Sequence, residues 1–542
     1  MFQLRLVLFC ILFVVRAHVL DAADAPVVNA LYPAGGQRGT EVAIEFIGSI
    51  STWPLSCSCD SDELKIEIDE AERTRAKITI QETARPGVHW LRLHGEYGAT
   101  RLRPFVVETV AEIREEELGS KLVDISEPRV INGRLTKKNE VDEFVVHLQQ
   151  GQTLAASVNA HRFLGTPMDC VMQIYDTKHE VVLRQIDDAP GRDPRCTFVA
   201  PHEGEFHIRL FAFPETPTQQ IEFAGRDDFV YRLSISTRGM LNYVVPLALS
   251  SPNASVHVAG PDLVGYEHDR RDHLFGFEKR CTIFRKAVPG WWTVPVVEEA
   301  SMESQTSDTP HTLPLLVTGC LSSEQDSAYD SFRLWGEKDQ KLRVDIKARS
   351  LGMMLDPVVA VFDAEGNKLK SVDDSQGRDC QLDFVVPKDG TYEVRVEDLH
   401  RNRGDEFVYL VSVKELAPDF KLHLPSGTFT MAQGESLKLT IEVERIGGFD
   451  EPISIGLLSL PPAVSVAGAT STMEHEGGSK VELELTAKEA CQGGFRVVGV
   501  SAKTNTVRIA DFASVVADTR LHDAWLTVKA PEAADKEAEE DD

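Results

Sequence analysis

Hydrophobic and polar residues alternate along most of this chain in short runs. Residues 41–46, 65–68 and 438–443 are typical, because an apolar side chain occupies every second position and polar or charged ones lie between. A period of two places alternate side chains on opposite faces of a strand, and turns rich in Gly, Pro, Asn and Asp separate the runs. The pattern predicts an all-β protein of tandem β-sandwiches. Residues 110–118, between two predicted domains, are the best candidate for a helix.

One stretch of sequence occurs twice. Residues 187–193, Asp-Asp-Ala-Pro-Gly-Arg-Asp, return at 373–379 as Asp-Asp-Ser-Gln-Gly-Arg-Asp. The sequences around them match at similar offsets: 141–144 with 329–332, 167–169 with 354–356, 173–176 with 360–363, 198–206 with 384–392, and 227–231 with 405–409. A repeat of this length predicts two copies of one domain.

The repeated pattern of Asp-x-Phe, apolar-x-apolar-Asp, Asp-Asp, Gly-x-aromatic and Tyr-x-apolar resembles the bacterial pre-peptidase C-terminal domain. The resemblance covers about 119–237 and 313–415. It implies a jelly-roll-like sandwich that is a non-catalytic extracellular module, often appended to a secreted peptidase. No peptidase domain is evident in this chain.

Three further regions have domain-like patterns. Residues 26–108 begin with Leu-Tyr-Pro-Ala-Gly-Gly-Gln-Arg-Gly-Thr at 31–40, which resembles the opening of immunoglobulin-like domains of the IPT/TIG kind. Residues 239–312 contain a degenerate echo of that domain followed by a linker. Residues 418–530 resemble bacterial Ig-like domains, and 531–542 form an acidic tail that we expect to be disordered.

Charge and the N-terminus constrain location and partners. The formal net charge of −28 argues against nucleic acid, whose phosphates require a basic surface, and suits solubility and cations. Residues 1–23 have one early cation, an apolar run from Leu6 to Val15 and small residues at Ala22 and Ala23, which predicts a secretory signal peptide. No other apolar stretch approaches the length of a transmembrane segment. We therefore expect export to the periplasm, the cell surface or the medium.

Eight cysteines remain after the predicted signal peptide. An even number in an exported chain permits disulfides, and Cys170 with Cys196 or Cys320 with Cys380 would each staple one sandwich. Buried free thiols are an equal alternative in domains of this size. The two repeats do not place cysteines at matching positions, so no disulfide belongs to the shared design.

The repeated acidic loops are the first candidate site. Carboxylate oxygens are the ligands that Ca²⁺ prefers, and six aspartates are the candidate ligands: Asp187, Asp188, Asp193, Asp373, Asp374 and Asp379. The competing interpretation is that Asp and Gly build a turn between strands, while Arg192 and Arg378 pair with neighbouring carboxylates.

The other motifs in the sequence are weaker candidates for a metal, catalytic or binding site. His202 and His207 are five residues apart on a predicted turn and strand, so they do not form a zinc-protease helix. Cys57 and Cys59 lack a second thiol pair, which makes a zinc site there improbable. Trp291-Trp292 is a candidate stacking platform, although adjacent strand residues face opposite sides and one ring is then expected in the core. No Gly-x-Ser-x-Gly elbow, phosphate loop or dinucleotide fingerprint occurs.

These features predict a non-catalytic exported binding or scaffold protein that interacts with an extracellular protein or polysaccharide. Two alternatives remain open from sequence: a secreted peptidase or peptidase-accessory protein, and a purely structural spacer. No cofactor is predicted other than the candidate Ca²⁺.

Overall fold

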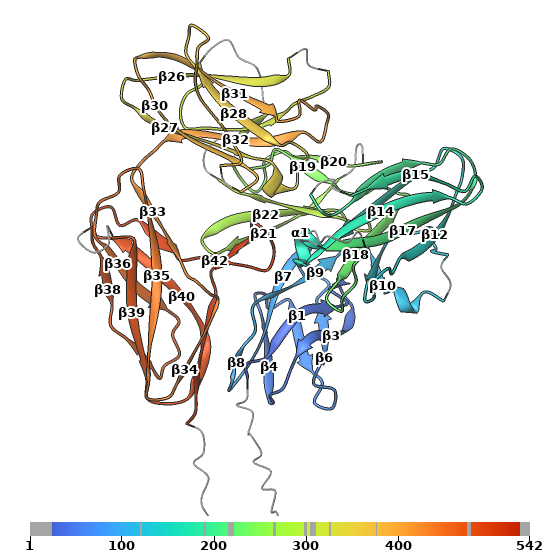
Figure 1. Ribbon diagram of the computed structural model, residues 1–542, viewed down its shortest axis with the longest axis horizontal. Coiled ribbons are helices and arrows are strands. Elements are labelled where there is room, and N and C mark those ends of the chain that lie inside the picture. Colours follow the sequence, from blue (N-terminus) through green and yellow to red (C-terminus); the bar gives the residue numbers. More distant parts are fainter. Residues whose placement is uncertain are drawn as a thin grey trace, which may run out of the picture.

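The computed structural model describes residues 24–119, 122–187, 191–214, 222–263, 267–297, 301–303, 310–324, 327–375, 377–473 and 478–531. The fold is almost entirely β-structure, which confirms the fold class expected from the alternating pattern. Four two-sheet domains surround a small central segment (Figure 1). The predicted signal peptide, Asp188 and the tail beyond Pro531 lie outside the described residues. No helix in the described part is long and apolar enough to cross a membrane.

The N-terminal domain packs a sheet of order β1-β3-β6-β5 against one of order β2-β9-β7-β4, with β8 beside β7. Its second strand pairs in parallel with its last. Ile44, Ile78 and Phe105 are fully buried between the sheets. The strands are β1 (Val27–Tyr32), β2 (Gly35–Gln37), β3 (Glu41–Ser49), β4 (Leu55–Cys59), β5 (Leu64–Ile68), β6 (Arg75–Ile80), β7 (Gly87–Gly95), β8 (Gly98–Ala99) and β9 (Arg103–Glu108).

The two sequence repeats form two sandwiches with one topology. The first repeat has sheets of order β10-β11-β18-β13-β16 and β12-β17-β14-β15, and the second has β24-β25-β32-β27-β30 and β26-β31-β28-β29. The first comprises β10 (Ala111–Arg114), η1 (Glu115–Glu117), β11 (Arg129–Arg134), β12 (Asp142–Leu148), β13 (Thr153–Asn159), α1 (His161–Leu164), β14 (Met168–Asp176), β15 (Val181–Ile186), β16 (Arg195–Val199), β17 (Gly204–Pro214) and β18 (Val230–Ser236). The second comprises β24 (Ser301–Glu303), β25 (Leu315–Cys320), β26 (Tyr329–Gly336), β27 (Lys341–Lys347), η2 (Arg349–Leu351), β28 (Pro357–Phe362), β29 (Lys368–Asp373), β30 (Cys380–Val385), β31 (Gly390–Asp398) and β32 (Val408–Glu415).

The repeated Asp and Tyr of the motif meet inside each sandwich. The hydroxyl of Tyr231 donates to Asp142 Oδ2 at 2.6 Å, and that of Tyr409 donates to Asp330 Oδ2 at 2.6 Å. Both tyrosines are fully buried, so each phenol needs an acceptor in the core. This pairing explains why these two positions recur in the sequence.

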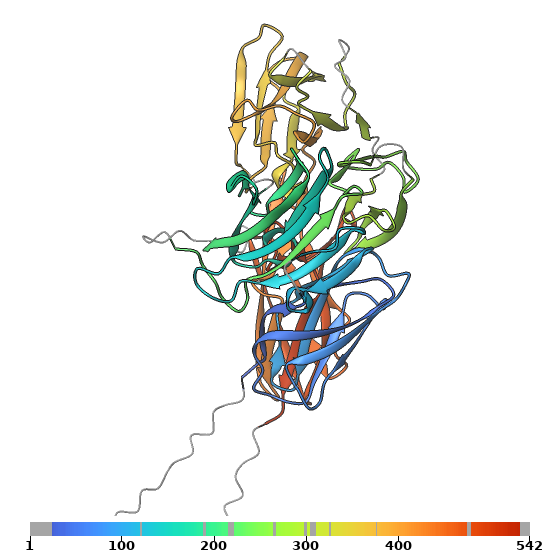
Figure 2. The ribbon, with the colours of Figure 1, turned by 90° about the vertical axis from the view of Figure 1, so that its right-hand side faces the viewer.

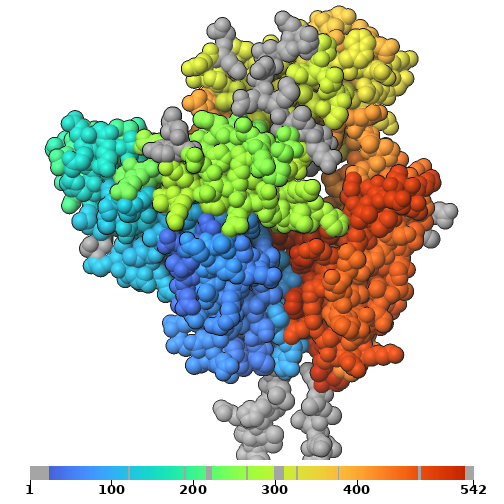
Figure 3. All heavy atoms as spheres, turned by 180° about the vertical axis from the view of Figure 1, so that it is seen from behind, coloured from blue at the N-terminus to red at the C-terminus, as the bar shows by residue number. Residues whose placement is uncertain are grey.

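The central segment contains a pair of strands, β19 (Tyr243–Val245) and β20 (His257–Ala259), and a three-stranded sheet of β21 (Asp269–Phe275), β22 (Glu278–Phe284) and β23 (Trp291–Pro295). The sequence predicts a reduced TIG-like domain here. The apolar side chains of the described part of this segment belong to the same core cluster as those of the second repeat, and the degenerate TIG-like assignment stays a prediction. In Figure 3 the segment lies across the middle of the molecule, between the N-terminal domain and the second repeat.

The C-terminal domain packs β33-β35-β39-β37 against a sheet that contains β34-β44-β40-β36-β38, with β41 beside β40. Figure 2 shows it behind the N-terminal domain, and Figure 3 shows the two domains side by side. Its strands are β33 (Asp419–His423), β34 (Thr428–Ala432), β35 (Ser436–Ile446), β36 (Ile453–Leu458), β37 (Val464–Val466), β38 (Ala469–Ser471), β39 (Lys480–Ala487), β40 (Cys491–Ser501), β41 (Val507–Ile509), β42 (Phe512–Ala513), β43 (Arg520–Leu521) and β44 (Ala524–Lys529).

The structure corrects one local expectation and decides between two open alternatives. Residues 110–118 contain β10 and the single turn η1 rather than a helix, because β10 pairs in parallel with β11 and extends the sheet. All eight cysteines that the structure describes are free thiols, which is the second of the two alternatives left open by the sequence. Cys320 Sγ lies 3.6 Å from the carbonyl oxygen of Gly404, whereas Cys380 Sγ lies 2.8 Å from the carbonyl oxygen of Pro357.

A buried polar junction joins the N-terminal domain, the first repeat and the central segment. The carboxylate of Glu108 accepts the backbone N–H of Thr109 at 2.9 Å and that of Gly290 at 3.1 Å. Four residues on, Glu112 pairs with the buried guanidinium of Arg232. Burial raises the pKa of Glu108 to about 7. Hydrogen bonds therefore hold the segment that connects the first two domains against the central segment.

The buried carboxyl pair in the first repeat makes a testable prediction about pH. Tyr231 has one hydroxyl proton, yet its oxygen lies 2.6 Å from Asp142 and 3.1 Å from Glu115. Burial, assisted by the charge of Asp142, raises the pKa of Glu115 to about 8. The folded state then holds a proton that the unfolded chain releases near pH 4, so stability falls as the pH rises from about 5 to 8. We expect Glu115→Gln to reduce this decline, by on the order of 5 °C in melting temperature.

The measurement is thermal unfolding at pH 5 and pH 8, with Glu127→Gln, an exposed glutamate paired with Arg238, as the control. Parallel profiles for the wild type and Glu115→Gln would contradict a proton held by the pair.

Candidate functional site

One cavity of about 250 Å³ lies where the N-terminal domain, both repeats, the central segment and the C-terminal domain meet. Six arginines and two aspartates contribute to its lining: Arg85, Arg162, Arg192, Arg280, Arg349, Arg378, Asp60 and Asp518. Aromatic rings complete much of the wall: Trp90, Phe163, Phe275, Trp291 and Trp292. In a chain with net charge −28, this concentration of arginine is unusual. We call this feature the arginine cavity.

Arg162 lines the arginine cavity. It follows the first residue of α1, and its Nη2 donates to the carbonyl of Leu351 in the second repeat at 2.5 Å. Its guanidinium lies over the rings of Phe163, at 4.7 Å, and Trp292, at 4.9 Å. Burial, with the nearby charge of Arg195, lowers the pKa of Arg162 to about 10, so it stays cationic at neutral pH.

The arginines differ in how they are neutralised. Arg85 donates to the carbonyls of Pro86 and Val88, and Arg162 to that of Leu351. Within the described part of the chain, neither forms an ion pair with a carboxylate. Three others do: Arg280 with Glu278 at 2.8 Å, Arg349 with Asp356 at 3.4 Å, and Arg378 with Asp518 at 3.3 Å. The cavity therefore retains positive charge that an anion would complement.

The repeated loops build this cavity. The carboxylate of Asp193 accepts the backbone N–H groups of residues 160, 161 and 162 at 3.2, 2.8 and 2.8 Å, and so holds the start of α1. Asp379 does the same for η2, because its Oδ1 accepts the N–H groups of Ala348, at 3.0 Å, and Ser350, at 3.4 Å. Each loop thereby positions the arginine of its own short helix, Arg162 or Arg349, at the cavity.

The arginines of the repeated motif face the same space. Arg192 and Arg378 immediately precede the two capping aspartates, and both line the cavity. A methyl group at Gly191 would lie 3.6 Å from Nη1 of Arg378, so the two loops approach each other closely. Arg378 pairs with Asp518 of the C-terminal domain rather than with an acid of its own loop. The sequence repeat thus supplies two sides of one site.

The predicted calcium ligands are divided between two environments. Asp193 and Asp379 are buried, and their oxygens accept the N–H groups described above. Asp187, Asp373 and Asp374 are exposed on the loops, and Asp188 lies outside the described residues. Two groups of described residues have the proximity of metal ligands, and neither contains any of these aspartates. Calcium binding at the loops stays a prediction.

Trp291 and Trp292 have the alternation expected of strand neighbours. Trp292 is 6% exposed and Trp291 is half-buried, which confirms that one ring enters the core. The ring of Trp291 lies 4.7 Å from that of Phe163 in the first repeat. Both tryptophans line the arginine cavity, a role that depends on how domains pack and that local sequence does not reveal.

His89 is a residue that sequence reasoning missed. It lies on β7, with Nε2 2.8 Å from the carbonyl of Arg85 and Nδ1 3.6 Å from Asp60 Oδ1. Cys59 Sγ lies 3.5 Å from the same oxygen, so the fold provides a third potential metal ligand that the Cys57-Ser58-Cys59 motif lacks. Burial raises the pKa of the Cys59 thiol well above its usual value. A thiol that stays protonated, beside Arg85, is a poor metal ligand and a poor nucleophile.

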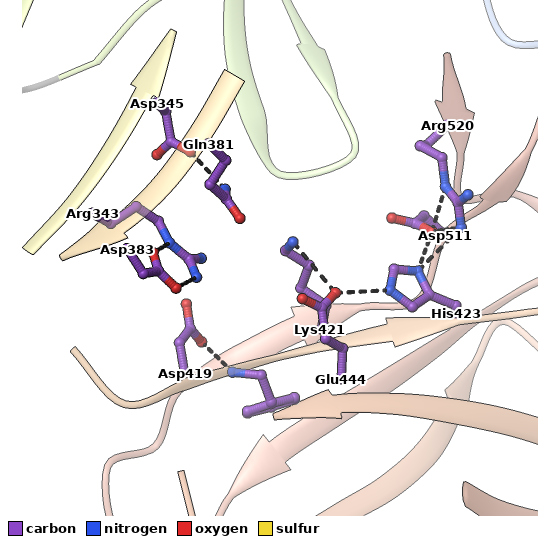
Figure 4. Close-up of polar contacts among 11 residues, drawn as sticks. Arg343, Asp345, Gln381, Asp383, Asp419, Lys421, His423, Glu444, Asp511 and Arg520 are labelled. Atoms are coloured by element: carbon purple, nitrogen blue, oxygen red, sulfur yellow. Dashed lines mark hydrogen bonds and ion pairs between the residues drawn. The ribbon is translucent and has the colours of Figure 1, made fainter. Parts of the chain in front are cut away.

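A second, larger space of about 700 Å³ separates the second repeat from the C-terminal domain. Figure 4 shows charged side chains on both sides of this boundary, among them the Arg343–Asp383 pair and the chain of contacts from Lys421 through Glu444, His423 and Asp511 to Arg520. Arg343 makes a two-bond pair with Asp383 at 2.7 and 2.8 Å, and Arg520 Nε donates to Asp511 at 2.8 Å. His423 lies 2.7 Å from Asp511, which raises the pKa of the imidazole. The first pair lies within the second repeat and the other contacts lie within the C-terminal domain, so these charges are neutralised separately on each side of the space.

Comparison with known proteins places a family domain within the second repeat. Residues 328–398 match the model of the bacterial pre-peptidase C-terminal domain. A probable subtilase-type serine protease of Deinococcus radiodurans is 25% identical over 205 residues, which are 34% of this chain and 27% of that protease. The match thus spans about a quarter of the length of that relative.

Solved structures of other β-proteins give only distant likenesses. The D0-D1 domain of intimin is 8% identical, with coverage of 38% of this chain and 96% of that chain, at a TM-score of 0.14. A Bacteroides ovatus SGBP-B solved with a mixed-linkage heptasaccharide is 12% identical, with coverage of 47% and 54%, at a TM-score of 0.15. Scores this low carry no argument about function. What the comparisons establish is a bacterial pre-peptidase C-terminal domain at residues 328–398.

Proposed function

We propose that this chain is a non-catalytic exported binding protein whose arginine cavity takes an acidic sugar of a polysaccharide. The observation that carries this proposal is the convergence of two copies of the same Gly-Arg-Asp loop on one cavity, with Arg85 and Arg162 lacking a carboxylate partner there. Guanidinium groups bind carboxylates through paired hydrogen bonds. Export is supported by the predicted signal peptide and by the pre-peptidase domain, whose resemblance implies a secreted setting.

Size and wall chemistry favour a sugar residue over a folded partner. A cavity of about 250 Å³ is below the roughly 300–1,000 Å³ of sites for drug-sized ligands, so it admits one small group at a time. Trp291 presents an aromatic face beside the arginines, and such faces contact the apolar side of a sugar ring. A uronic acid residue combines the anionic and the ring-shaped features that this wall complements.

The polysaccharide proposal predicts selective binding of acidic oligosaccharides. We expect an oligogalacturonate to bind the full chain by calorimetry, a neutral oligoglucose of equal length not to bind, and the affinity to fall as salt rises. Arg162→Gln should weaken binding at least about tenfold, since a hydrogen bond to a charged group contributes about 1.5–3 kcal/mol. Because Arg162 is buried, Arg378→Gln, at a half-exposed position, provides a second variant.

The matched control is Arg496→Gln, which removes an arginine paired with Asp523. It should bind as the wild type does. Equal binding by Arg162→Gln and Arg378→Gln, with unchanged melting temperatures, would place the ligand elsewhere. Binding of neither oligosaccharide would refute the polysaccharide proposal.

The accessory alternative has one observation in its favour, which is the similarity to part of a probable subtilase-type serine protease. The binding proposal expects no hydrolysis of casein by this chain after repeated purification. Activity that co-purifies through each step and is lost on substitution of a single Ser or His would establish a peptidase instead. A structural spacer would show neither hydrolysis nor binding.

We also propose that the acidic loops bind Ca²⁺. The test replaces the loop aspartates that do not cap the short helices. A ligand that binds only the folded state raises the melting temperature. If the loops bind Ca²⁺, millimolar Ca²⁺ should raise the melting temperature relative to excess chelator, and a variant with Asp187→Asn, Asp188→Asn, Asp373→Asn and Asp374→Asn should lose the rise. This variant leaves the helix-capping Asp193 and Asp379 in place. An identical melting temperature with and without Ca²⁺ would leave the loops with their structural role alone.

A further inference from the structure

Two imidazoles converge on one buried carboxylate in the first repeat, away from the arginine cavity. Asp176 ends β14, His179 lies in the turn that follows, and His202 precedes β17. Asp176 Oδ2 lies 2.6 Å from His179 Nδ1 and 2.8 Å from His202 Nε2. The side chain of Asp176 is 1% exposed, that of His202 16% and that of His179 55%. The cluster therefore has a buried floor and an open side.

Hydrogen bonding fixes the protonation of the His202 ring. Its Nδ1 lies 3.0 Å from the carbonyl oxygen of Glu203, which can only accept, so Nδ1 carries the hydrogen. In the neutral ring Nε2 then holds a lone pair, and this lone pair points at a carboxylate oxygen. Such a contact is repulsive unless a cation lies there, either a proton on Nε2 or a metal ion. A backbone carbonyl on the far nitrogen is also how metal-bound histidines are usually oriented.

The carboxylate of Asp176 is held in place independently of the imidazoles. Its Oδ1 accepts the backbone N–H of Lys178 at 2.9 Å. The ring of His202 also packs on that of Phe206, with centroids 5.2 Å apart. Two of the three polar groups are thus pre-positioned by contacts outside the cluster, and only His179 is free to adjust from the surface.

The second repeat has the corresponding turn without the histidines, so it shows which hydrogen bonds stabilise the turn. Asp363 occupies the position of Asp176, and its Oδ1 accepts the N–H groups of Glu365, at 3.1 Å, and Asn367, at 2.8 Å. Lys388 stands where the first repeat has His202, in the matching context after Pro, and it pairs with Glu365 at 3.3 Å. The aspartate alone therefore suffices to cap the turn. The two imidazoles are an addition specific to the first repeat.

We propose that Asp176, His179 and His202 form a binding site for a divalent transition-metal ion of the Zn²⁺ type. Two imidazole nitrogens and one carboxylate oxygen are a common zinc ligand set, whereas Ca²⁺ prefers oxygen ligands alone. All three ligand atoms lie within 4.8 Å of one another. Because His179 is exposed, a fourth position faces solvent. Bound metal would tie the 177–180 turn to the segment before β17, and the proposal does not depend on the function of the arginine cavity.

The test is calorimetric titration of the full chain with ZnCl₂ at pH 7.5 after removal of metals by chelator. The wild type should bind Zn²⁺ and gain melting temperature. His179→Ala and His202→Lys should each weaken binding at least about tenfold, a loss that removal of even an outer-sphere partner can cause. His202→Lys installs the residue found in the second repeat, so it is expected to fold, which its melting temperature in chelator checks.

His207→Ala is the matched control, since His207 is five residues from His202 but lies 3.1 Å from Glu143 instead. It should bind Zn²⁺ as the wild type does. Absence of Zn²⁺ binding by the wild type would overturn the proposal and leave a protonated His202 paired with Asp176. Unchanged binding by His202→Lys would also overturn it, because the ion would then lie elsewhere, for instance near Cys59, Asp60 and His89.

Discussion

The arrangement of the domains depends on burying charge where the chain passes from the first domain to the second. Glu108 and Arg232 are 2% and 1% exposed, and Glu112 pairs with Arg232. A buried charge without a partner costs several kcal/mol. The folded state is therefore stable only when the domains are packed so that these side chains have hydrogen-bond partners. Gly35 is part of that requirement, because a methyl group there would lie 2.6 Å from Nε of Arg232. The hydrogen bond from Gly290 to Glu108 then brings Trp291 and Trp292 to the cavity.

The two repeats keep some residues in common and differ at others. The structural elements are kept in both repeats: the Tyr–Asp pair in the core and the aspartate that caps α1 or η2. Other positions have diverged, since His202 in one copy corresponds to Lys388 in the other. Retained groups satisfy buried hydrogen-bonding needs, which any copy of the fold must meet. Groups that differ are free of that requirement and are where distinct chemistry is expected.

The pairing of charged side chains differs between the domain boundary and the candidate binding site. At the boundary between the second repeat and the C-terminal domain, Arg343 pairs with Asp383 on one side and Arg520 pairs with Asp511 on the other. In the arginine cavity, Arg85 and Arg162 donate to backbone carbonyls and form no ion pair with a described residue, so nearby carboxylates such as Asp60 and Asp193 offset their charge only in part. Because the rest of the chain is strongly acidic, an anionic ligand would be repelled from most of the surface and attracted only where arginines gather. This contrast is the physical basis for proposing that the cavity binds an anionic ligand.

Much of the architecture was determined by sequence alone. Alternation of apolar and polar residues predicted the sandwiches, since a strand with one buried face needs a period of two, and the repeat predicted two domains of one topology. The same local patterns misjudged residues 110–118, where pairing of β10 with β11 overrides helical propensity. They also did not reveal that apolar residues of the central segment share a core with the second repeat.

The candidate sites were decided by tertiary structure. Asp193 and Asp379 stood out in the sequence as acids, but only the fold shows that they hold short helices and turn the adjacent arginines toward one cavity. His89 approaches Asp60, and His179 and His202 approach Asp176, across loops whose path no local pattern encodes. A strand's faces follow from its own residues, whereas a site between domains depends on contacts between residues far apart in the sequence, such as Arg162 and Leu351, which are 189 positions apart.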